Sequence, residues 1–303
     1  MRWRGVDWGA VFHRWSGPVS IGLTLLGVAL GLYWIAILGT DGGVDGHAYF
    51  LADPFAPYGH GAQVMGPDAY LYSPAFAQII SPLRWLGWPV FIVSLRLLEL
   101  GALAYLAGPL TPLVLFWSPV ASEIDAANIH LLIGAAAIYG LRQPGAWAFV
   151  LLTKVSPGVG LLWFVVRREW TALRTALLVT VAIVAVSVVL SPAAWADWVG
   201  VLAYNATHPV LFSDLMPTSV SPVVRVPLAA AMVIVGARLG WTWLLPGAIT
   251  LALPAVWFHA LAILTAIPRR LMVDWRSRGA SANGAGVSTS ASGVGAGAGV
   301  RPQ

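Results

Sequence analysis

The feature that most limits how this chain can fold is a run of residues, 18–38, that contains no charge. A helix needs about 20 apolar residues to cross a bilayer, so the run can span one, and it is too long for a signal-peptide core. Only 10% of all residues are charged, against roughly 25% in soluble domains. The sequence therefore predicts an all-α polytopic membrane protein, a transmembrane helical bundle with candidate spans at 18–38, 88–107, 127–141, 171–190 and 218–239.

The distribution of charge predicts the orientation of the bundle. Residues 39–73 and 191–217 contain aspartates but no lysine or arginine, whereas residues 1–17 and the arginine pairs at 167–168 and 269–270 are basic. Because basic segments stay in the cytoplasm, we expect the first two segments to be outer loops. We expect the N-terminus 1–17 and a flexible Gly/Ala/Ser-rich tail, 271–303, to be cytoplasmic.

Two apolar regions within the expected transmembrane domain, 18–270, are broken by proline. Residues 146–166 contain Ser-Pro-Gly at 156–158, and we predict a re-entrant pair of short helices there with Lys154 at its tip. Such broken helices are tolerated where they line a cavity walled by protein. Two further short helices are expected to meet near Pro254, which would keep the tail inside.

The long first outer loop is the main candidate for chemistry. It contains Asp41, Asp45, Asp53 and Asp68 among several tyrosines and phenylalanines. A carboxylate just outside a lipid-facing helix can act as a general base on an acceptor hydroxyl. The simpler interpretation is a solvated turn, but loops longer than about 12–15 residues are usually functional or disordered, and the aromatic residues favour a structured one.

Charged side chains inside the apolar segments have two interpretations each. Arg96 and Glu99 lie three residues apart on one helix face and predict an ion pair that locks packing. Lys154 is either a phosphate ligand or a lysine that extends to the interface. Asp125 is a candidate N-cap for the helix that starts near Asn128 and His130, where a helix N-terminus favours anions.

Several classes of function are not expected. The chain has no cysteine, which excludes disulfides and thiolate nucleophiles. The histidine spacings match no metal motif, and we therefore expect no metal and no cofactor. The arginines are scattered at segment ends and form no stripe that would bind nucleic acid. A lone histidine such as His259 is either structural or functional.

Four motifs appear in a defined order: "DGHAY" at 45–49, "YLYSPAFAQIISPL" at 70–83, "LLTKVSPGVGLLWFVVRREW" at 151–170 and "LPAVWFHA" at 253–260. Together they resemble the polytopic glycosyltransferases of the GT-C class. Within that class they resemble glycosyltransferase family 87, the actinobacterial polyprenol-phosphate-mannose-dependent α-mannosyltransferases. The sequence departs from the family pattern at Val256 and Ala260, which replace a serine and a second histidine.

This resemblance implies a hexosyltransferase in the cell membrane that uses polyprenyl-phosphate mannose, or a related lipid-linked sugar, as its donor. The reaction would invert the anomeric carbon, with Asp45 as the base, no metal, and a glycolipid, glycan or protein as acceptor. The residues expected around the sugar and phosphate are Asp41, Tyr49, Tyr72, Asn128, His130, Lys154, Trp257 and His259. The alternative is a lipid-sugar flippase, a transporter or an inactive scaffold, which would need no base.

Overall fold

The computed structural model describes residues 8–59, 68–208 and 220–274. Within these ranges the chain forms helices and no strands, which confirms the all-α prediction. Residues 1–7, the loop portions 60–67 and 209–217, and the tail from 275 to 303 lie outside the described residues, so the predictions made for them stay predictions.

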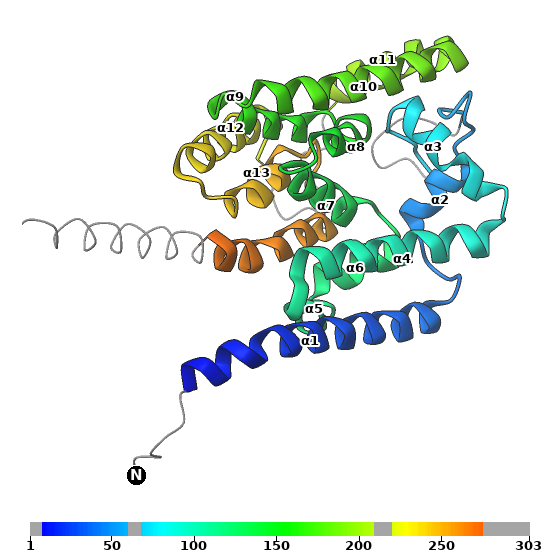
Figure 1. Cartoon of the computed structure of the whole chain (residues 1–303). Helices are drawn as coiled ribbons and strands as arrows, with labels where there is room; N and C mark the ends of the chain where they lie inside the picture. Colours follow the sequence, from blue (N-terminus) through cyan, green and yellow to red (C-terminus); the bar gives the residue numbers. More distant parts are fainter. Residues whose placement is uncertain (1–7, 60–67, 209–219, 275–303) are drawn as a thin grey trace, which may run out of the picture.

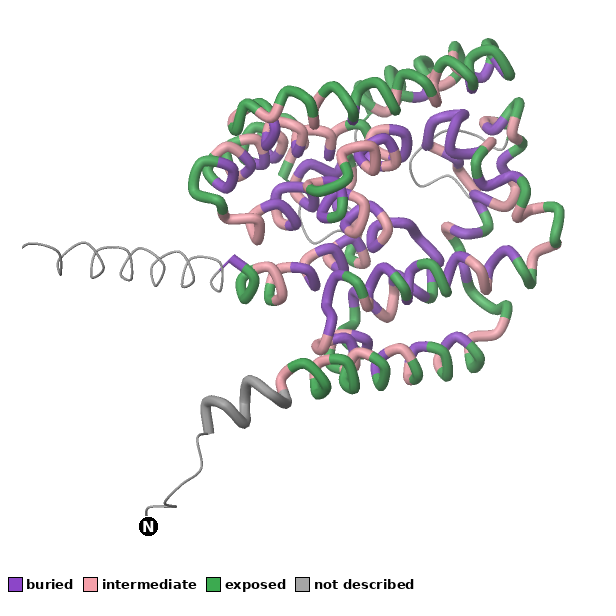
Figure 2. The backbone as a smooth tube through the Cα atoms, viewed as in Figure 1, coloured by how far each residue is buried: buried purple, intermediate pink, exposed green. Residues whose placement is uncertain are grey.

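Four helical stretches are long and apolar enough to cross a membrane. They are Ser16–Leu38 of α1 (Trp8–Leu38), Trp88–Val114, Trp170–Leu190 and Pro222–Leu239. The second comprises α4 (Trp88–Ala107), η1 (Gly108–Leu110) and α5 (Thr111–Val114), and the last two are α10 and α12. Only 11% of the α10 window and 17% of the α1 window are buried, and their apolar surfaces face outward (Figure 2). Apolar surface on this scale requires lipid, so this is a polytopic membrane protein.

The fifth predicted span, 127–141, is wrong. Its helix, α7, covers only His130–Gly140, about 17 Å at 1.5 Å per residue, against a hydrocarbon core of about 30 Å. The residues before it form a turn in which Ala127 is left-handed, with φ of 52°. This turn separates α7 from α6 (Ser118–Ala126), so the apolar run at 127–141 is not one continuous helix.

The predicted pairs of short helices are present between the long ones (Figure 1). η2 (Pro144–Ala146) and α8 (Trp147–Thr153) lead to Lys154, and η3 (Ser156–Leu161) and α9 (Leu162–Val166) lead back. Arg142 and Arg167, on either side of this element, line the same cavity. α13 (Leu244–Ala252) and η4 (Phe258–Thr265) form the second pair, and Thr242 and Arg269 line that cavity too.

The expected outer loops contain helices of their own. α2 (Val44–Leu51) lies in the first loop and is followed by α3 (Pro74–Arg84). The second loop is mostly α11 (Pro192–Thr207), a 16-residue helix. In Figure 1 α1 lies on one side of the molecule, α10 and α11 lie on the other, and the short helices lie between them.

Arg96 and Glu99 are both fully buried, but the predicted ion pair between them does not form. The Arg96 guanidinium instead donates to four backbone carbonyls, those of Gly39, Asp41, Ile124 and Asp125. Carbonyls at helix C-termini have no partner within their helix, and a planar five-donor guanidinium can satisfy several of them. Both carboxyl oxygens of Glu99 lack a hydrogen bond to any described residue.

Candidate active site

The start of α2 is fixed against two other helices. Gly43 precedes α2 with φ of 75°, and its N–H donates to the carbonyl of Asp125 at the end of α6 over 2.8 Å. A Cβ at Gly43 would lie only 2.5 Å from Cδ1 of Ile92 in α4, so the position requires glycine for both conformation and space. This packing holds Asp45, in the first turn of α2, beside the turn between α6 and α7.

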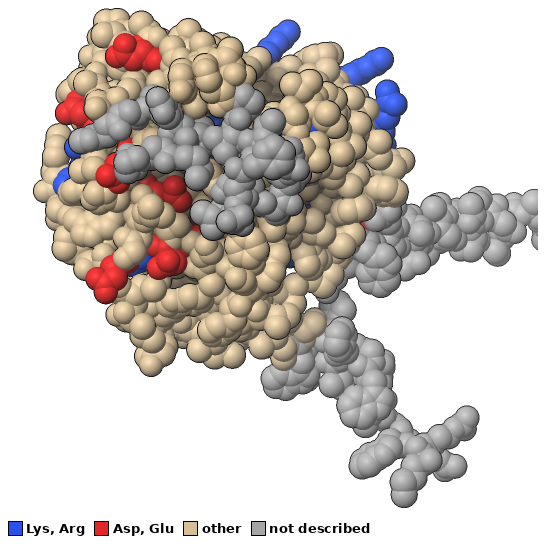
Figure 3. All heavy atoms as spheres, turned by 180° about the vertical axis from the view of Figure 1, so that it is seen from behind, with Lys and Arg blue, Asp and Glu red and all other residues tan. Residues whose placement is uncertain are grey.

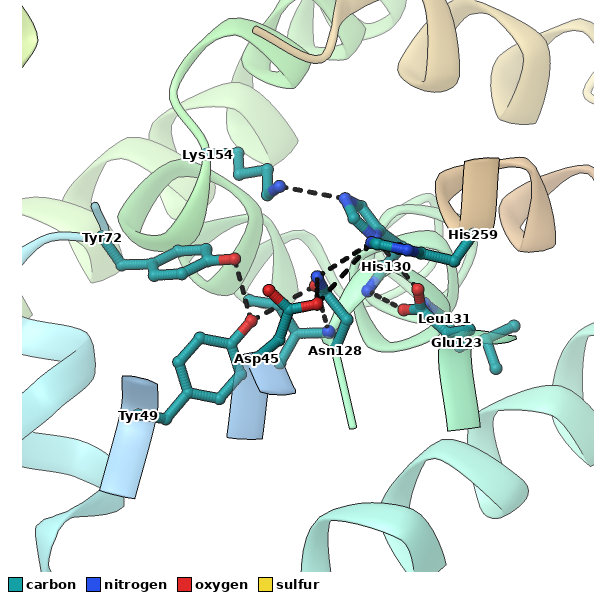
Figure 4. A network of polar contacts seen from close by, with 10 residues as sticks. Asp45, Tyr49, Tyr72, Glu123, Asn128, His130, Leu131, Lys154 and His259 are labelled. Atoms are coloured by element: carbon teal, nitrogen blue, oxygen red, sulfur yellow. Dashed lines mark hydrogen bonds and ion pairs between the residues drawn. The ribbon is translucent and has the colours of Figure 1, made fainter. Parts of the chain in front are cut away.

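Asn128 lies in that turn and forms the centre of a polar network (Figure 4). Its side-chain Nδ2 donates to Asp45 Oδ2 over 2.8 Å and lies 3.2 Å from Nε2 of His259. Its Oδ1 accepts the N–H of Ile129 over 2.6 Å. The Asn128 amide thereby joins α2, the α6–α7 turn and η4.

Two buried tyrosines extend the network. The Tyr49 hydroxyl donates to Oδ1 of Asn128 over 3.2 Å and lies 2.9 Å from the Tyr72 hydroxyl. Because the proton of Tyr49 goes to Asn128, the proton of Tyr72 goes to the Tyr49 oxygen. Burial raises the pKa of both phenols above the usual value, so both stay protonated and serve as donors.

A second row of polar groups lies beside the first. Lys154 Nζ is 2.9 Å from His130 Nε2, and His130 Nδ1 is 3.1 Å from Glu123 Oε2. An ammonium can only donate, so His130 accepts at Nε2 and carries its proton on Nδ1. The Glu123 Oε1 accepts the backbone N–H groups of His130 and Leu131, over 2.5 Å and 3.3 Å. Glu123, and not the predicted Asp125, therefore caps α7, while Asp125 lies within α6.

Burial changes the protonation of this row. It lowers the pKa of Lys154 to about 8, although the charges of Asp45 and Glu123 act in the opposite direction. It raises the pKa of the Glu123 carboxyl to about 7. It also lowers the pKa of His259, so the 3.8 Å approach of His259 Nε2 to Asp45 Oδ2 is a contact with a mainly neutral imidazole, which Asn128 bridges.

An apolar cavity of about 210 Å³ lies next to the polar network. Its lining comes from α3, η2, α8 and α10 and includes Phe76, Phe149, Leu152 and Thr153. The Phe76 ring packs against those of Tyr49 and Tyr72, with centroids 5.7 Å and 5.4 Å apart, and Thr153 precedes Lys154 in the chain. Polar groups for a headgroup and apolar surface for a hydrocarbon chain are therefore adjacent.

Comparison with known families identifies the family of this chain. The sequence model of glycosyltransferase family 87 matches residues 70–283, more than half of the chain. This chain belongs to glycosyltransferase family 87. It is therefore a membrane glycosyltransferase. No curated protein and no solved structure matches the chain. The family match contains Tyr72, Asn128, Lys154 and His259 but starts after Asp45, so the position of Asp45 rests on the network.

The structure assembles six of the predicted site residues of this family member around Asp45, namely Tyr49, Tyr72, Asn128, His130, Lys154 and His259. The Asp41 side chain is exposed, and the hydrogen bonds of this residue are made by its backbone, whose carbonyl accepts from Arg96 and whose N–H donates to the carbonyl of Leu38. Trp257 is half-buried before η4 and makes no side-chain hydrogen bond to the network. Neither is brought into the site by these contacts.

The other outer aspartates have local partners. Asp53 Oδ1 accepts the N–H groups of Phe55 and Ala56, over 2.8 Å and 3.1 Å, and closes its own turn. Asp68 Oδ1 lies 2.7 Å from Nδ1 of His47. Neither aspartate forms a hydrogen bond to the Asn128 network.

Glu123 is the member of the network that sequence reasoning missed. The signal was present, since a carboxylate stands a few residues before a helix N-terminus. Glu123, His130 and His259 also place one ligand atom each within 4.8 Å of one another, as a metal ion would require. Both His130 nitrogens are already engaged, and the Lys154 ammonium lies against one of them. A cation bound at these three atoms would be repelled by that ammonium. The expectation of no metal stays a prediction.

Proposed function

We propose that this family 87 member transfers a hexose, most simply mannose, from a polyprenyl-phosphate donor to an acceptor hydroxyl at the outer membrane face. The protein would have the architecture of the GT-C class. The acceptor would be a glycolipid, a glycan or a protein. The observation that carries the proposal is the proximity of a carboxylate, Asp45, and a half-buried ammonium, Lys154, beside an apolar cavity.

Asp45 is suited to act as the general base. Its Oδ2 is held by Asn128, while its Oδ1 has no hydrogen bond to any described residue. Its side chain is 34% exposed, whereas those of Glu123 and His130 are fully buried. Oδ1 would accept the proton of the acceptor hydroxyl as that oxygen attacks the anomeric carbon. The bond to the phosphate oxygen breaks on the opposite face, which inverts the anomeric carbon.

Lys154 is suited to hold the phosphate that departs. The ammonium lies 5.5 Å from the centroid of the Tyr72 ring, next to the apolar cavity that would take the start of the prenyl chain. A fixed cation stabilises the negative charge that develops on the leaving oxygen. Phosphate is a good leaving group without protonation, so one carboxylate suffices and no second carboxylic acid is required.

Asp45→Asn tests the proposal. The amide keeps the shape but cannot take a proton, so transfer from polyprenyl-phosphate mannose to membrane glycolipids should fall by about 10²-fold or more. The matched control is Asp53→Asn, which alters an outer aspartate that closes its own turn and should leave the rate nearly unchanged. Full transfer by Asp45→Asn would overturn the mechanism and favour a flippase or scaffold, which needs no base.

A further inference from the structure

A second and larger polar cavity, of about 420 Å³, lies at the end of the bundle remote from Asp45. The loops and helix ends that line it come from widely separated parts of the chain. Its charged lining residues are Arg142, Arg167, Glu169, Arg269, Arg270 and Asp274. Four arginines face two carboxylates, which leaves an excess of two positive charges. We call this site the arginine cavity.

The two carboxylates of the arginine cavity are already in use. Glu169 Oε1 accepts from Arg167 Nε over 2.7 Å. The Asp274 carboxylate accepts from the Thr242 hydroxyl over 2.8 Å and from the N–H of Trp243 over 3.2 Å. Neither forms an ion pair within 4.0 Å with Arg142 or Arg269 in the described part of the chain.

Positive charge is therefore concentrated and incompletely balanced. The Arg269 guanidinium donates to the carbonyl of Tyr105, a neutral acceptor. The Arg142 side chain is exposed and makes no hydrogen bond or ion pair with the described residues. Burial lowers the pKa of Arg270. The charge of Asp274 opposes this shift, whereas the nearby charges of Arg142 and Arg269 add to it. A site with this surplus favours an anion that a planar guanidinium can bind, such as phosphate.

The arginine cavity lies at the level where membrane helices end. Gly240, in its lining, directly follows α12, and Glu169 directly precedes α10. The other end of α10 lies beside the first outer segment, because Ser191 Oγ donates to the carbonyl of Phe55 over 2.7 Å. The 21 residues of α10 extend about 31 Å, a full bilayer core. The cavity and the outer segment therefore lie at opposite membrane surfaces.

The surface charge agrees with this separation. In Figure 3 acidic side chains gather over one side of the molecule, whereas basic side chains project from the opposite edge. Apolar and aromatic residues accompany the arginines, since Tyr105 and the buried Trp163 line the cavity. Val273 lines the cavity, and it and its chain neighbours Leu271 and Met272 are each 41% exposed. A soluble anion would leave these apolar residues exposed to water. The acyl chains of a lipid with an anionic headgroup would cover them.

We propose that the arginine cavity binds the phosphate of an anionic phospholipid from the leaflet opposite the Asp45 site. The guanidinium of Arg142 would take the headgroup, with Arg269 and Arg270 behind it, and the acyl chains would lie along the exposed apolar residues. Basic pockets between membrane helices commonly bind anionic headgroups in this way. The inference does not depend on the sugar donor or on Asp45.

The test uses the full-length protein in a neutral detergent with short-chain dioctanoyl phosphatidylglycerol as the probe. Binding is measured by native mass spectrometry or by the rise in melting temperature across a titration. Each arginine near a membrane surface contributes about 1 kcal/mol to such binding, or roughly five-fold in affinity. Arg142→Gln should therefore bind about five-fold more weakly. Arg174→Gln, an exposed arginine of α10 outside the cavity lining, should bind as the unaltered protein does.

Two further arms make the outcome decisive. Dioctanoyl phosphatidylcholine tests the need for net negative charge, and inorganic pyrophosphate tests a soluble source of phosphate. Phosphatidylglycerol binding that weakens in Arg142→Gln but not in Arg174→Gln supports the proposal. Equal binding of phosphatidylcholine, saturation by pyrophosphate alone, or unchanged affinity in Arg142→Gln would overturn it. The melting temperature of lipid-free Arg142→Gln shows that the variant is folded, and sugar transfer by Asp45→Asn is scored separately.

Discussion

Asn128 has the central position in the site. Its side-chain amide forms hydrogen bonds with Asp45, His259, Tyr49 and the backbone N–H of Ile129. The side chain is almost fully buried, at 2% exposure. We expect Asn128→Ala to lower the transfer rate by about 10²-fold, because Asp45 loses its orienting donor. The variant should also lose about 1–3 kcal/mol of stability, because the buried Tyr49 hydroxyl loses its acceptor. The transfer rate and the melting temperature measure the two effects.

Gln143→Ala provides the matched control for Asn128→Ala. Gln143 is an exposed amide between the end of α7 and η2, and its truncation should change neither the transfer rate nor the melting temperature. Transfer at the unaltered rate by Asn128→Ala would show that Asp45 does not need this contact.

Lys154 should make the rate of transfer fall at alkaline pH, as an alkaline limb of the pH–rate profile. It lies in the connection between α8 and η3, and burial lowers its pKa to about 8. A lysine loses its charge as pH rises through its pKa, so donor phosphate is bound well below pH 8 and progressively less above it. We expect kcat/KM to fall about ten-fold per pH unit above that point. In Lys154→Arg the guanidinium stays charged, and the limb should disappear even where the absolute rate is lower. An identical limb in Lys154→Arg would assign it to another group.

At the scale of elements, Arg96 holds together two segments that are far apart in the sequence. Its guanidinium ties the α1–α2 link, through Gly39 and Asp41, to the end of α6, through Ile124 and Asp125. These are the two segments that place Asp45 and Asn128. Glu99, one turn further along α4, makes no hydrogen bond to the described residues.

This asymmetry predicts different effects for two amide substitutions. Arg96→Gln should destabilise the protein strongly, since four buried or part-buried carbonyls lose a donor, at up to about 1–3 kcal/mol each. Glu99→Gln should change stability by less than about 1 kcal/mol, because no hydrogen bond is lost. Thermal unfolding in detergent measures both, and Arg96→Lys serves where Arg96→Gln does not fold. Similar losses in the two amide variants would instead indicate the ion pair that the sequence pattern predicted.

At the scale of the whole molecule, the sequence predicts those features that depend on residues close together in the chain. Long apolar runs predict long helices such as α1 and α10. The Ser-Pro-Gly break predicts the short helices around Lys154. Both kinds of signal depend on neighbouring residues alone. The capping of α7 by Glu123 and the four carbonyls around Arg96 depend on contacts between distant segments. The error at 127–141 has the same origin, since composition does not reveal the left-handed turn at Ala127. The outer aspartates and Lys154 stood out as charges next to or within apolar segments, but only the order of motifs selected Asp45 among the aspartates.

The orientation of the whole molecule in the membrane can be tested directly, because the chain contains no cysteine. Single cysteines can be placed at two exposed positions, Ala56 in the first outer segment and Gln143 beside the arginine cavity. The positive-inside rule places the acidic segment outside and the arginines in the cytoplasm. A membrane-impermeant maleimide should therefore label Ala56→Cys in intact cells, and Gln143→Cys only after permeabilisation. Labelling of both in intact cells would contradict the opposite placement of the two cavities, and labelling of Gln143→Cys alone would invert the topology and place the Asp45 site in the cytoplasm.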